Sequence, residues 1–167
     1  MAEAPEGVVT HRQRRPDPRG PGHQVSAFVV DASVVVRWFV PEIHSDAARR
    51  LLTLPHEYFA PDLLFAETAN TIWKKIRRGE LTAEHGRQLV EDIGRVAVET
   101  VPCRMLAVDA HELASATGRT VYDSMYLALA IRLTTRMLTA DERLAAAVTA
   151  LPMTAAHIQL VQTFKSV

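Results

Sequence analysis

The chain has 167 residues, of which 48% are hydrophobic and 23% charged, a length and composition typical of one globular domain with a buried core. Its 19 basic and 19 acidic side chains balance, so bulk charge does not indicate a nucleic-acid partner, although binding depends on how charge is distributed. The single cysteine, Cys103, excludes an internal disulfide and a cysteine-based zinc site, and favours a reducing, cytoplasmic setting.

The hydrophobic pattern predicts neither a membrane-spanning segment nor a secretory signal. The longest apolar passage, residues 27–40, is interrupted by Asp31 and Arg37. Residues 1–24 are rich in proline, glycine and arginine and hold few large apolar side chains, so we expect a disordered tail. Residues 25–167 are expected to form the folded domain.

Strands and helices are expected to alternate along the folded part of the chain. The expected strands are residues 28–30, 56–60, 98–101, 136–139 and 157–161. The expected helices are residues 33–39, 44–54, 62–78, 82–96, 104–117, 120–131 and 141–149, with Pro61 opening the third. This alternation predicts an α/β fold, in which a central, mostly parallel sheet is flanked by helices on both faces.

Asp31 directly follows the apolar, β-branched strand Phe28-Val29-Val30. An unpaired carboxylate inside the protein would cost several kcal/mol, on the order of the desolvation penalty of an ion. Asp31 is therefore expected at the open end of the strand, facing a cleft, a cation or a loop. Taken alone, it is better explained as a cap on the following helix.

Three further acids share this unusual setting. Glu67 lies in a helical stretch with almost no other charge, Asp123 in the first turn of an apolar helix, and Asp141 after the strand Met137-Leu138-Thr139. In a parallel sheet, the carboxyl ends of strands meet at the edge where such folds bind ligands. Each acid taken singly could instead cap a helix or pair with a nearby Arg or Lys.

Four acids in apolar surroundings would repel one another unless a positive charge lay among them. A hard divalent cation, Mg²⁺ or Mn²⁺, is the natural partner because it prefers oxygen ligands. Other chemistries lack support, since the sequence has no P-loop, no glycine-rich dinucleotide fingerprint, no paired zinc histidines and no Gly-x-Ser-x-Gly elbow. We therefore expect a metal site at Asp31, Glu67, Asp123 and Asp141.

These motifs resemble the PIN-domain family, and more narrowly the VapC-type ribonuclease toxins of bacterial toxin–antitoxin pairs. The resemblance covers about residues 26–163. It rests on four stretches, which are Val30-Asp31-Ala32-Ser33, Glu67 with Asn70, Tyr122-Asp123-Ser124-Met125-Tyr126-Leu127-Ala128-Leu129-Ala130 and Leu138-Thr139-Ala140-Asp141-Glu142-Arg143-Leu144.

The resemblance implies a metal-dependent endoribonuclease that hydrolyses RNA phosphodiester bonds. Asp31 and Asp123 would be the main metal ligands, with Glu67 and Asp141 binding directly or through water. Ser33, Asn70 and Thr139 occupy positions where the family often has supporting polar groups. The resemblance further implies a homodimer and a small antitoxin protein that blocks the site.

An all-acid pocket repels the RNA backbone, so basic side chains near the site must attract the strand. Arg37, close to the first motif, is the candidate. Two alternatives from other classes remain open. One is a receiver-like or phosphoryl-transfer α/β domain with an Asp acceptor, and the other is an inactive PIN-like module that binds RNA or protein.

Overall fold

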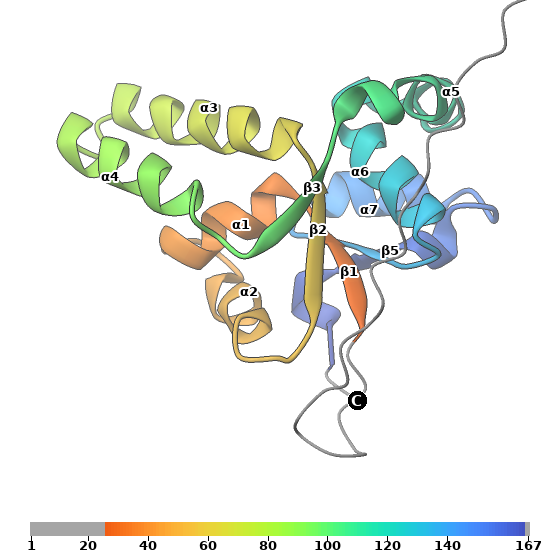
Figure 1. The fold of residues 1–167 in the computed structure, drawn as a ribbon, viewed down its shortest axis with the longest axis horizontal. Coiled ribbons are helices and arrows are strands. Elements are labelled where there is room, and N and C mark those ends of the chain that lie inside the picture. Colours follow the sequence, from red (N-terminus) through yellow and green to blue (C-terminus); the bar gives the residue numbers. More distant parts are fainter. Residues whose placement is uncertain (1–25, 166–167) are drawn as a thin grey trace, which may run out of the picture.

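A computed structural model describes residues 26–165 of the chain (Figure 1), so the tail expected at residues 1–24 lies outside the described residues. Five strands form one sheet in the order β3-β2-β1-β4-β5, and every neighbouring pair is parallel. The strands are β1 (Ala27–Val30), β2 (Glu57–Pro61), β3 (Val98–Val101), β4 (Met137–Thr139) and β5 (Ile158–Leu160).

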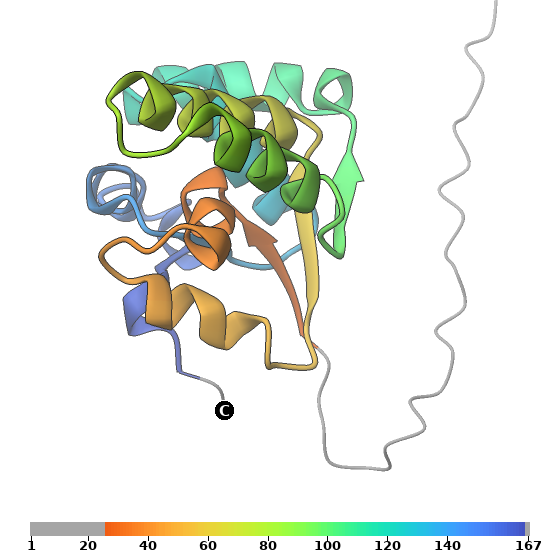
Figure 2. The same cartoon turned by 90° about the vertical axis from the view of Figure 1, so that its left-hand side faces the viewer.

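Seven α-helices connect the strands in the described part of the chain. They are α1 (Ala32–Phe39), α2 (Ser45–Leu51), α3 (Leu63–Arg77), α4 (Ala83–Ile93), α5 (Ala107–Thr117), α6 (Val121–Arg132) and α7 (Glu142–Thr149). Helices α1 to α4 lie on one side of the sheet and α5 and α6 on the other (Figures 1 and 2). The single α/β domain with a parallel sheet covered on both faces is thus confirmed.

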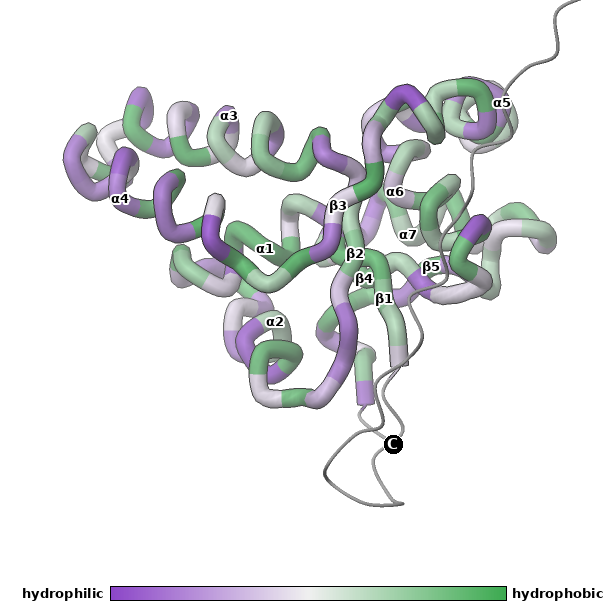
Figure 3. The backbone as a smooth tube through the Cα atoms, viewed as in Figure 1, coloured by the Kyte–Doolittle hydropathy of each residue, from purple (hydrophilic) through white to green (hydrophobic). Residues whose placement is uncertain are grey.

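The core is centred on β1 and β4, whose apolar side chains are almost completely buried. Val29, Val30, Met137 and Leu138 all have 0% exposure. These strands are coloured as hydrophobic in Figure 3, whereas much of α4 is hydrophilic. Because both faces of the central strands are covered, they are continuous apolar runs, and the first polar side chains appear where the strands end.

Most elements begin and end within three residues of the expectation, and two segments differ in kind. Pro61 is the last residue of β2, where it pairs with Val101, and α3 begins two residues later at Leu63. The helix expected from residue 104 is divided into a 3₁₀ turn, Cys103–Met105, and α5 from Ala107. Among residues 26–165, no helix has both the length and the apolar character needed to cross a membrane.

Candidate metal centre

Asp31 lies where β1 ends, and its side chain is held by two hydroxyl groups. Its Oδ2 atom accepts hydrogen bonds from Ser33 Oγ at 2.7 Å and from Thr139 Oγ1 at 2.6 Å. Asp31 occupies the position that precedes α1, but its side chain makes no capping hydrogen bond to the helix. The side chain is therefore held by one hydroxyl from the first turn of α1 and one from the end of β4, and not by the backbone N–H groups of the helix.

The same two hydroxyl groups join the first turn of α1 to the end of β4 and the residues that follow it. Ser33 Oγ accepts the backbone N–H of Ala140 at 3.0 Å, and Thr139 Oγ1 accepts that of Asp141 at 3.0 Å. Each hydroxyl thus accepts from a backbone amide and donates to the Asp31 carboxylate. This arrangement fixes the orientation of Asp31, which is only 9% exposed. The supporting positions expected for Ser33 and Thr139 agree with this geometry.

Glu67 projects from the second turn of α3 and is bound by a tyrosine of α6. The hydroxyl of Tyr126 donates to Glu67 Oε2 at 2.6 Å, and Tyr126 is only 1% exposed. Tyr126 was not among the expected site residues. Its position three residues after Asp123, on the same face of one helix, is the sequence signal that could have identified it.

Asp123 lies in the first turn of α6, whose N-terminus is capped by Thr120. Thr120 Oγ1 accepts the backbone N–H of Asp123 at 3.1 Å, which fixes the backbone at this residue. The carboxylate lies 3.6 Å from Nη2 of Arg119. Among the ion pairs of residues 26–165, this is the one that involves a candidate acid. Arg119 was not predicted either.

The carboxyl groups of Asp31, Glu67 and Asp123 act on one another electrostatically. Burial raises the pKa of Asp31, the hydrogen bonds from Thr139 and Ser33 lower it, and the charge of Asp123 raises it again, with a net increase. Burial also raises the pKa of Glu67, against the lowering effect of Tyr126, and the charges of Asp31 and Asp123 add to the increase. The fold thus brings three of the four predicted acids into one cluster.

Asp141 has a different environment. Its Oδ1 atom accepts the backbone N–H groups of Arg143 at 2.8 Å and Leu144 at 3.0 Å, so this side chain caps α7. Its own backbone N–H reaches Asp31 indirectly, through Thr139. Asp141 is therefore adjacent to the cluster but uses one carboxylate oxygen to stabilise a helix.

Two other predicted residues lie apart from this network. Asn70 is exposed on α3, one turn beyond Glu67. The guanidinium of Arg37 donates to the carbonyl oxygens of Ser33 at 2.7 Å and Ile43 at 2.8 Å, and its Nη2 atom lies 3.2 Å from Glu42. These contacts hold the loop after α1. The guanidinium of Arg37 therefore has a structural role, and its charge is already paired with Glu42.

The chemistry of the three clustered acids fits a hard divalent cation. All three offer carboxylate oxygens, and a cation among them would offset both the burial and the mutual repulsion that raise the pKa values of Asp31 and Glu67. In the described part of the chain, however, no three His, Cys, Asp or Glu side chains are close enough together to hold a metal ion as they stand.

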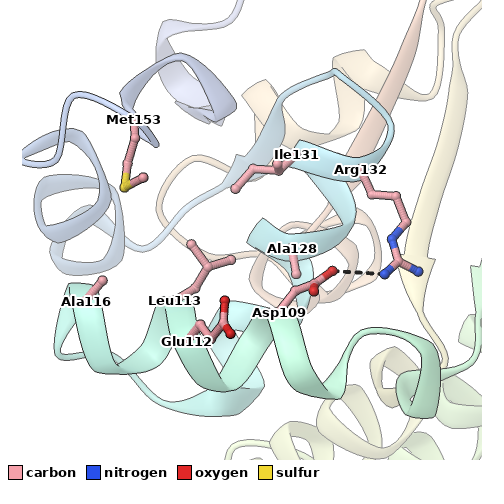
Figure 4. A pocket seen from close by; sticks show the side chains of 8 residues that line it. All are labelled: Asp109, Glu112, Leu113, Ala116, Ala128, Ile131, Arg132 and Met153. Atoms are coloured by element: carbon pink, nitrogen blue, oxygen red, sulfur yellow. Dashed lines mark hydrogen bonds and ion pairs between the residues drawn. The ribbon is translucent and has the colours of Figure 1, made fainter.

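A separate pocket of about 450 Å³ lies between α5, α6 and the segment around Met153 (Figure 4). Leu113, Ile131 and Met153 contribute apolar side chains, and Asp109 forms an ion pair with Arg132 at 2.9 Å. None of the predicted site residues lines this pocket. The acidic cluster is therefore distinct from it.

The fold and this cluster define a parallel α/β domain with an acidic centre at the carboxyl edge of its sheet. The PIN domain profile matches residues 28–149. Over 120 residues the chain is 36% identical to Ribonuclease VapC3 of Pyrobaculum aerophilum, and this match covers 71% of the chain and 92% of that protein. The chain belongs to the PIN-domain family.

Solved structures with the same fold include a VapC toxin and a VapBC complex. The crystal structure of PAE2754 from Pyrobaculum aerophilum superposes with a TM-score of 0.60 and 21% identity, covering 85% of this chain and 88% of that one. VapC20 of Mycobacterium tuberculosis, described as a sarcin-ricin loop cleaving toxin, gives 0.57 and 17%, covering 72% and 94%. VapBC2 from Rickettsia felis, bound to a promoter DNA fragment, gives 0.54 and 12%, covering 80% and 98%. These similarities show the fold.

Proposed function

We propose that this protein is a metal-dependent endoribonuclease and the toxin of a toxin–antitoxin pair. The observation that carries the proposal is the cluster of Asp31, Glu67 and Asp123, in which burial first, and then the charges of neighbouring carboxylates, raise the pKa values of Asp31 and Glu67. The 36% identity to Ribonuclease VapC3 supports RNA as the substrate. Because the chain belongs to the PIN-domain family, a receiver-like domain is not needed to explain its acidic residues.

Asp31, Glu67 and Asp123 would hold Mg²⁺ or Mn²⁺, and Asp141 would contribute directly or through water. Such an ion lowers the pKa of a bound water and stabilises charge on the attacked phosphate. The residues of this chain supply orientation. Ser33 and Thr139 hold the Asp31 carboxylate at its Oδ2 atom, and Tyr126 holds Glu67 at Oε2.

The proposal includes a small antitoxin that binds the protein and a homodimer in solution. The antitoxin is supported by the VapBC2 complex of Rickettsia felis, which has the same fold. The homodimer rests on the resemblance to VapC-type toxins alone. Both are tested by co-expression of the chain with the product of a short neighbouring gene, followed by measurement of the mass of the complex in solution.

Cleavage of RNA by the purified protein tests the proposed activity. We expect cleavage in Mg²⁺ or Mn²⁺, none in EDTA, and a loss of at least about 100-fold in Asp31→Asn and Asp123→Asn. Glu57→Gln, which changes an exposed acid on β2, is the matched control and should cleave normally. Equal cleavage by wild type and both site variants would indicate a contaminating nuclease. RNA binding without cleavage would favour the inactive-module alternative.

A further inference from the structure

Arg119 lies in the short turn between α5 and α6, and its backbone is firmly held. Gly118 has a φ of +66°, in the left-handed region that favours glycine, and its N–H donates to Ala114 O at 2.9 Å to end α5. The N–H of Arg119 donates to Thr117 Oγ1 at 3.3 Å, and Thr120 then caps α6. The Arg119 side chain therefore starts from a fixed point beside Asp123.

The guanidinium of Arg119 is incompletely satisfied in this position. Its Nη2 atom lies 3.6 Å from Asp123 Oδ2, a distance compatible with an ion pair but longer than a normal hydrogen bond. Its Nε atom is buried and has no hydrogen-bond partner among residues 26–165. Buried N–H groups are almost always paired, so an unpaired one on a charged side chain indicates that a partner is absent.

The charges around Arg119 indicate what that partner is. The clustered carboxylates of Asp31, Glu67 and Asp123 attract the guanidinium while no cation is among them. A divalent cation bound to Asp123 would repel the guanidinium and weaken this ion pair. The planar guanidinium would then be available to an anion, and phosphate matches its two-pronged donor geometry.

Arg37, the basic residue expected near the first motif, does not fill this role. Its donors are used by Ser33 O, Ile43 O and the Glu42 carboxylate. Within the described part of the chain, the guanidinium of Arg119 has only the single long contact with Asp123. It is thus the better placed of the two arginines to contact a strand that approaches the acidic cluster.

We propose that Arg119 binds a phosphate group of the RNA strand at the metal-loaded site, in exchange for its ion pair with Asp123. This inference rests on the proposed ribonuclease function. It assigns to Arg119 direct contact with the substrate, in addition to its position beside a metal ligand.

The test compares Arg119→Gln with Arg132→Gln, which removes the arginine that ends α6. Arg132 pairs with Asp109 at 2.9 Å, at the opposite end of that helix. Binding of a fluorescein-labelled oligoribonucleotide is measured by anisotropy in Ca²⁺ at several salt concentrations, and a gel verifies that the RNA remains intact. We expect Arg119→Gln to weaken binding about tenfold and to reduce the slope of log K against log salt by about 0.7, the value for one lost phosphate contact on a single strand. Arg132→Gln should change neither quantity.

A second readout separates contact with RNA from support of the metal site. Binding of Mn²⁺ alone, followed by electron paramagnetic resonance, should be unchanged or tighter in Arg119→Gln because a repelling charge is removed. Weaker Mn²⁺ binding with an unchanged salt slope would overturn the inference and make Arg119 a residue that only positions Asp123. Unchanged RNA affinity in Arg119→Gln would also overturn it. If the wild-type protein neither binds nor cleaves RNA, the proposed function itself fails.

Discussion

Thr139 donates a 2.6 Å hydrogen bond to Oδ2 of Asp31, although the two residues are 108 positions apart in the chain. The bond joins the carboxyl ends of the adjacent parallel strands β1 and β4. It orients a buried carboxylate without supplying a positive charge. The hydrogen bonds thus hold the Asp31 side chain in place but do not compensate its negative charge. A bound cation would supply that compensation.

Thr139→Val should reduce divalent-metal affinity and RNA cleavage by about 10- to 100-fold, as is common when a residue that orients a metal ligand is lost. Valine keeps the shape of threonine but removes the donor to Asp31 and the acceptor for the Asp141 N–H. Mn²⁺ titration followed by thermal unfolding measures the effect. Thr154→Val, which removes a buried hydroxyl bonded to Val148 O, is the control and should leave Mn²⁺ affinity unchanged. Equal affinity in Thr139→Val and wild type would contradict the orienting role.

Tyr126→Phe should lower cleavage because Glu67 loses the hydroxyl that holds it. We expect a decrease of about tenfold in kcat/KM and a loss of about 1 kcal/mol in stability. Tyr58→Phe is a close control, since the buried Tyr58 hydroxyl also donates at 2.6 Å, but to Leu51 O in a region away from the acids. It should cost similar stability and leave kcat/KM intact. If the two variants lose equal activity, Tyr126 has only a structural role.

Asp31→Asn should stabilise the metal-free protein at neutral pH. Burial raises the pKa of Asp31 above its ordinary value of 3.8, so the unfolded chain releases this proton at a lower pH than the folded protein does. Stability therefore falls as pH rises from about 3.8 through the folded-state pKa, and the loss persists at higher pH. Asparagine avoids this loss, so we expect a gain in stability at pH 7 that disappears below about pH 3.8.

Urea unfolding in EDTA across a pH series measures this gain. Glu57→Gln, on the exposed side of β2, should show no comparable change. Excess Mg²⁺ should reverse the order, because ligand binding stabilises the wild-type protein and not a variant that has lost a ligand. An Asp31→Asn protein that is less stable than wild type at pH 7 in EDTA would contradict the assignment of Asp31 as a buried, unneutralised acid.

Asp141 caps α7 and also has a predicted catalytic role. Two substitutions distinguish the contribution of the cap from that of the catalytic role. Asp141→Asn keeps an oxygen for the N–H groups of Arg143 and Leu144, so stability should change by less than about 0.5 kcal/mol while cleavage falls. Asp141→Ala should in addition lose about 1 kcal/mol of stability. Chemical unfolding and cleavage assays on both variants provide the comparison. Full activity in Asp141→Asn would show that the residue serves as a cap alone.

The sequence predicted the elements that depend on continuous apolar runs or on local capping. Val29 and Val30 mark a buried strand, and Thr82 and Thr120, the first residues of two expected helices, cap α4 and α6. Pro61 was assigned to a helix because proline often begins one, but pairing with Val101 of β3 keeps it in a strand. That pairing joins distant segments, which local patterns cannot reveal.

The acids of the candidate site were identifiable because charged residues are unusual in apolar segments. Their partners were not. Whether Asp31 or Asp141 caps its helix depends on side-chain rotamers and on loops from other strands, and the structure assigns that role to Asp141. Tyr126 resembles an ordinary core residue until Glu67 of α3 is placed beside it. Arg37 was chosen for its proximity in sequence, before the folding of Glu42 and Ile43 around it was known.

The central claim is that Asp31, Glu67 and Asp123 together bind a divalent cation. A crystal of the protein soaked in Mn²⁺ and measured at the manganese absorption edge tests it most directly. We predict an anomalous peak bounded by these three carboxylates, absent from crystals of Asp31→Asn. A peak elsewhere, or no peak among these carboxylates at a Mn²⁺ concentration that supports RNA cleavage, would contradict the account.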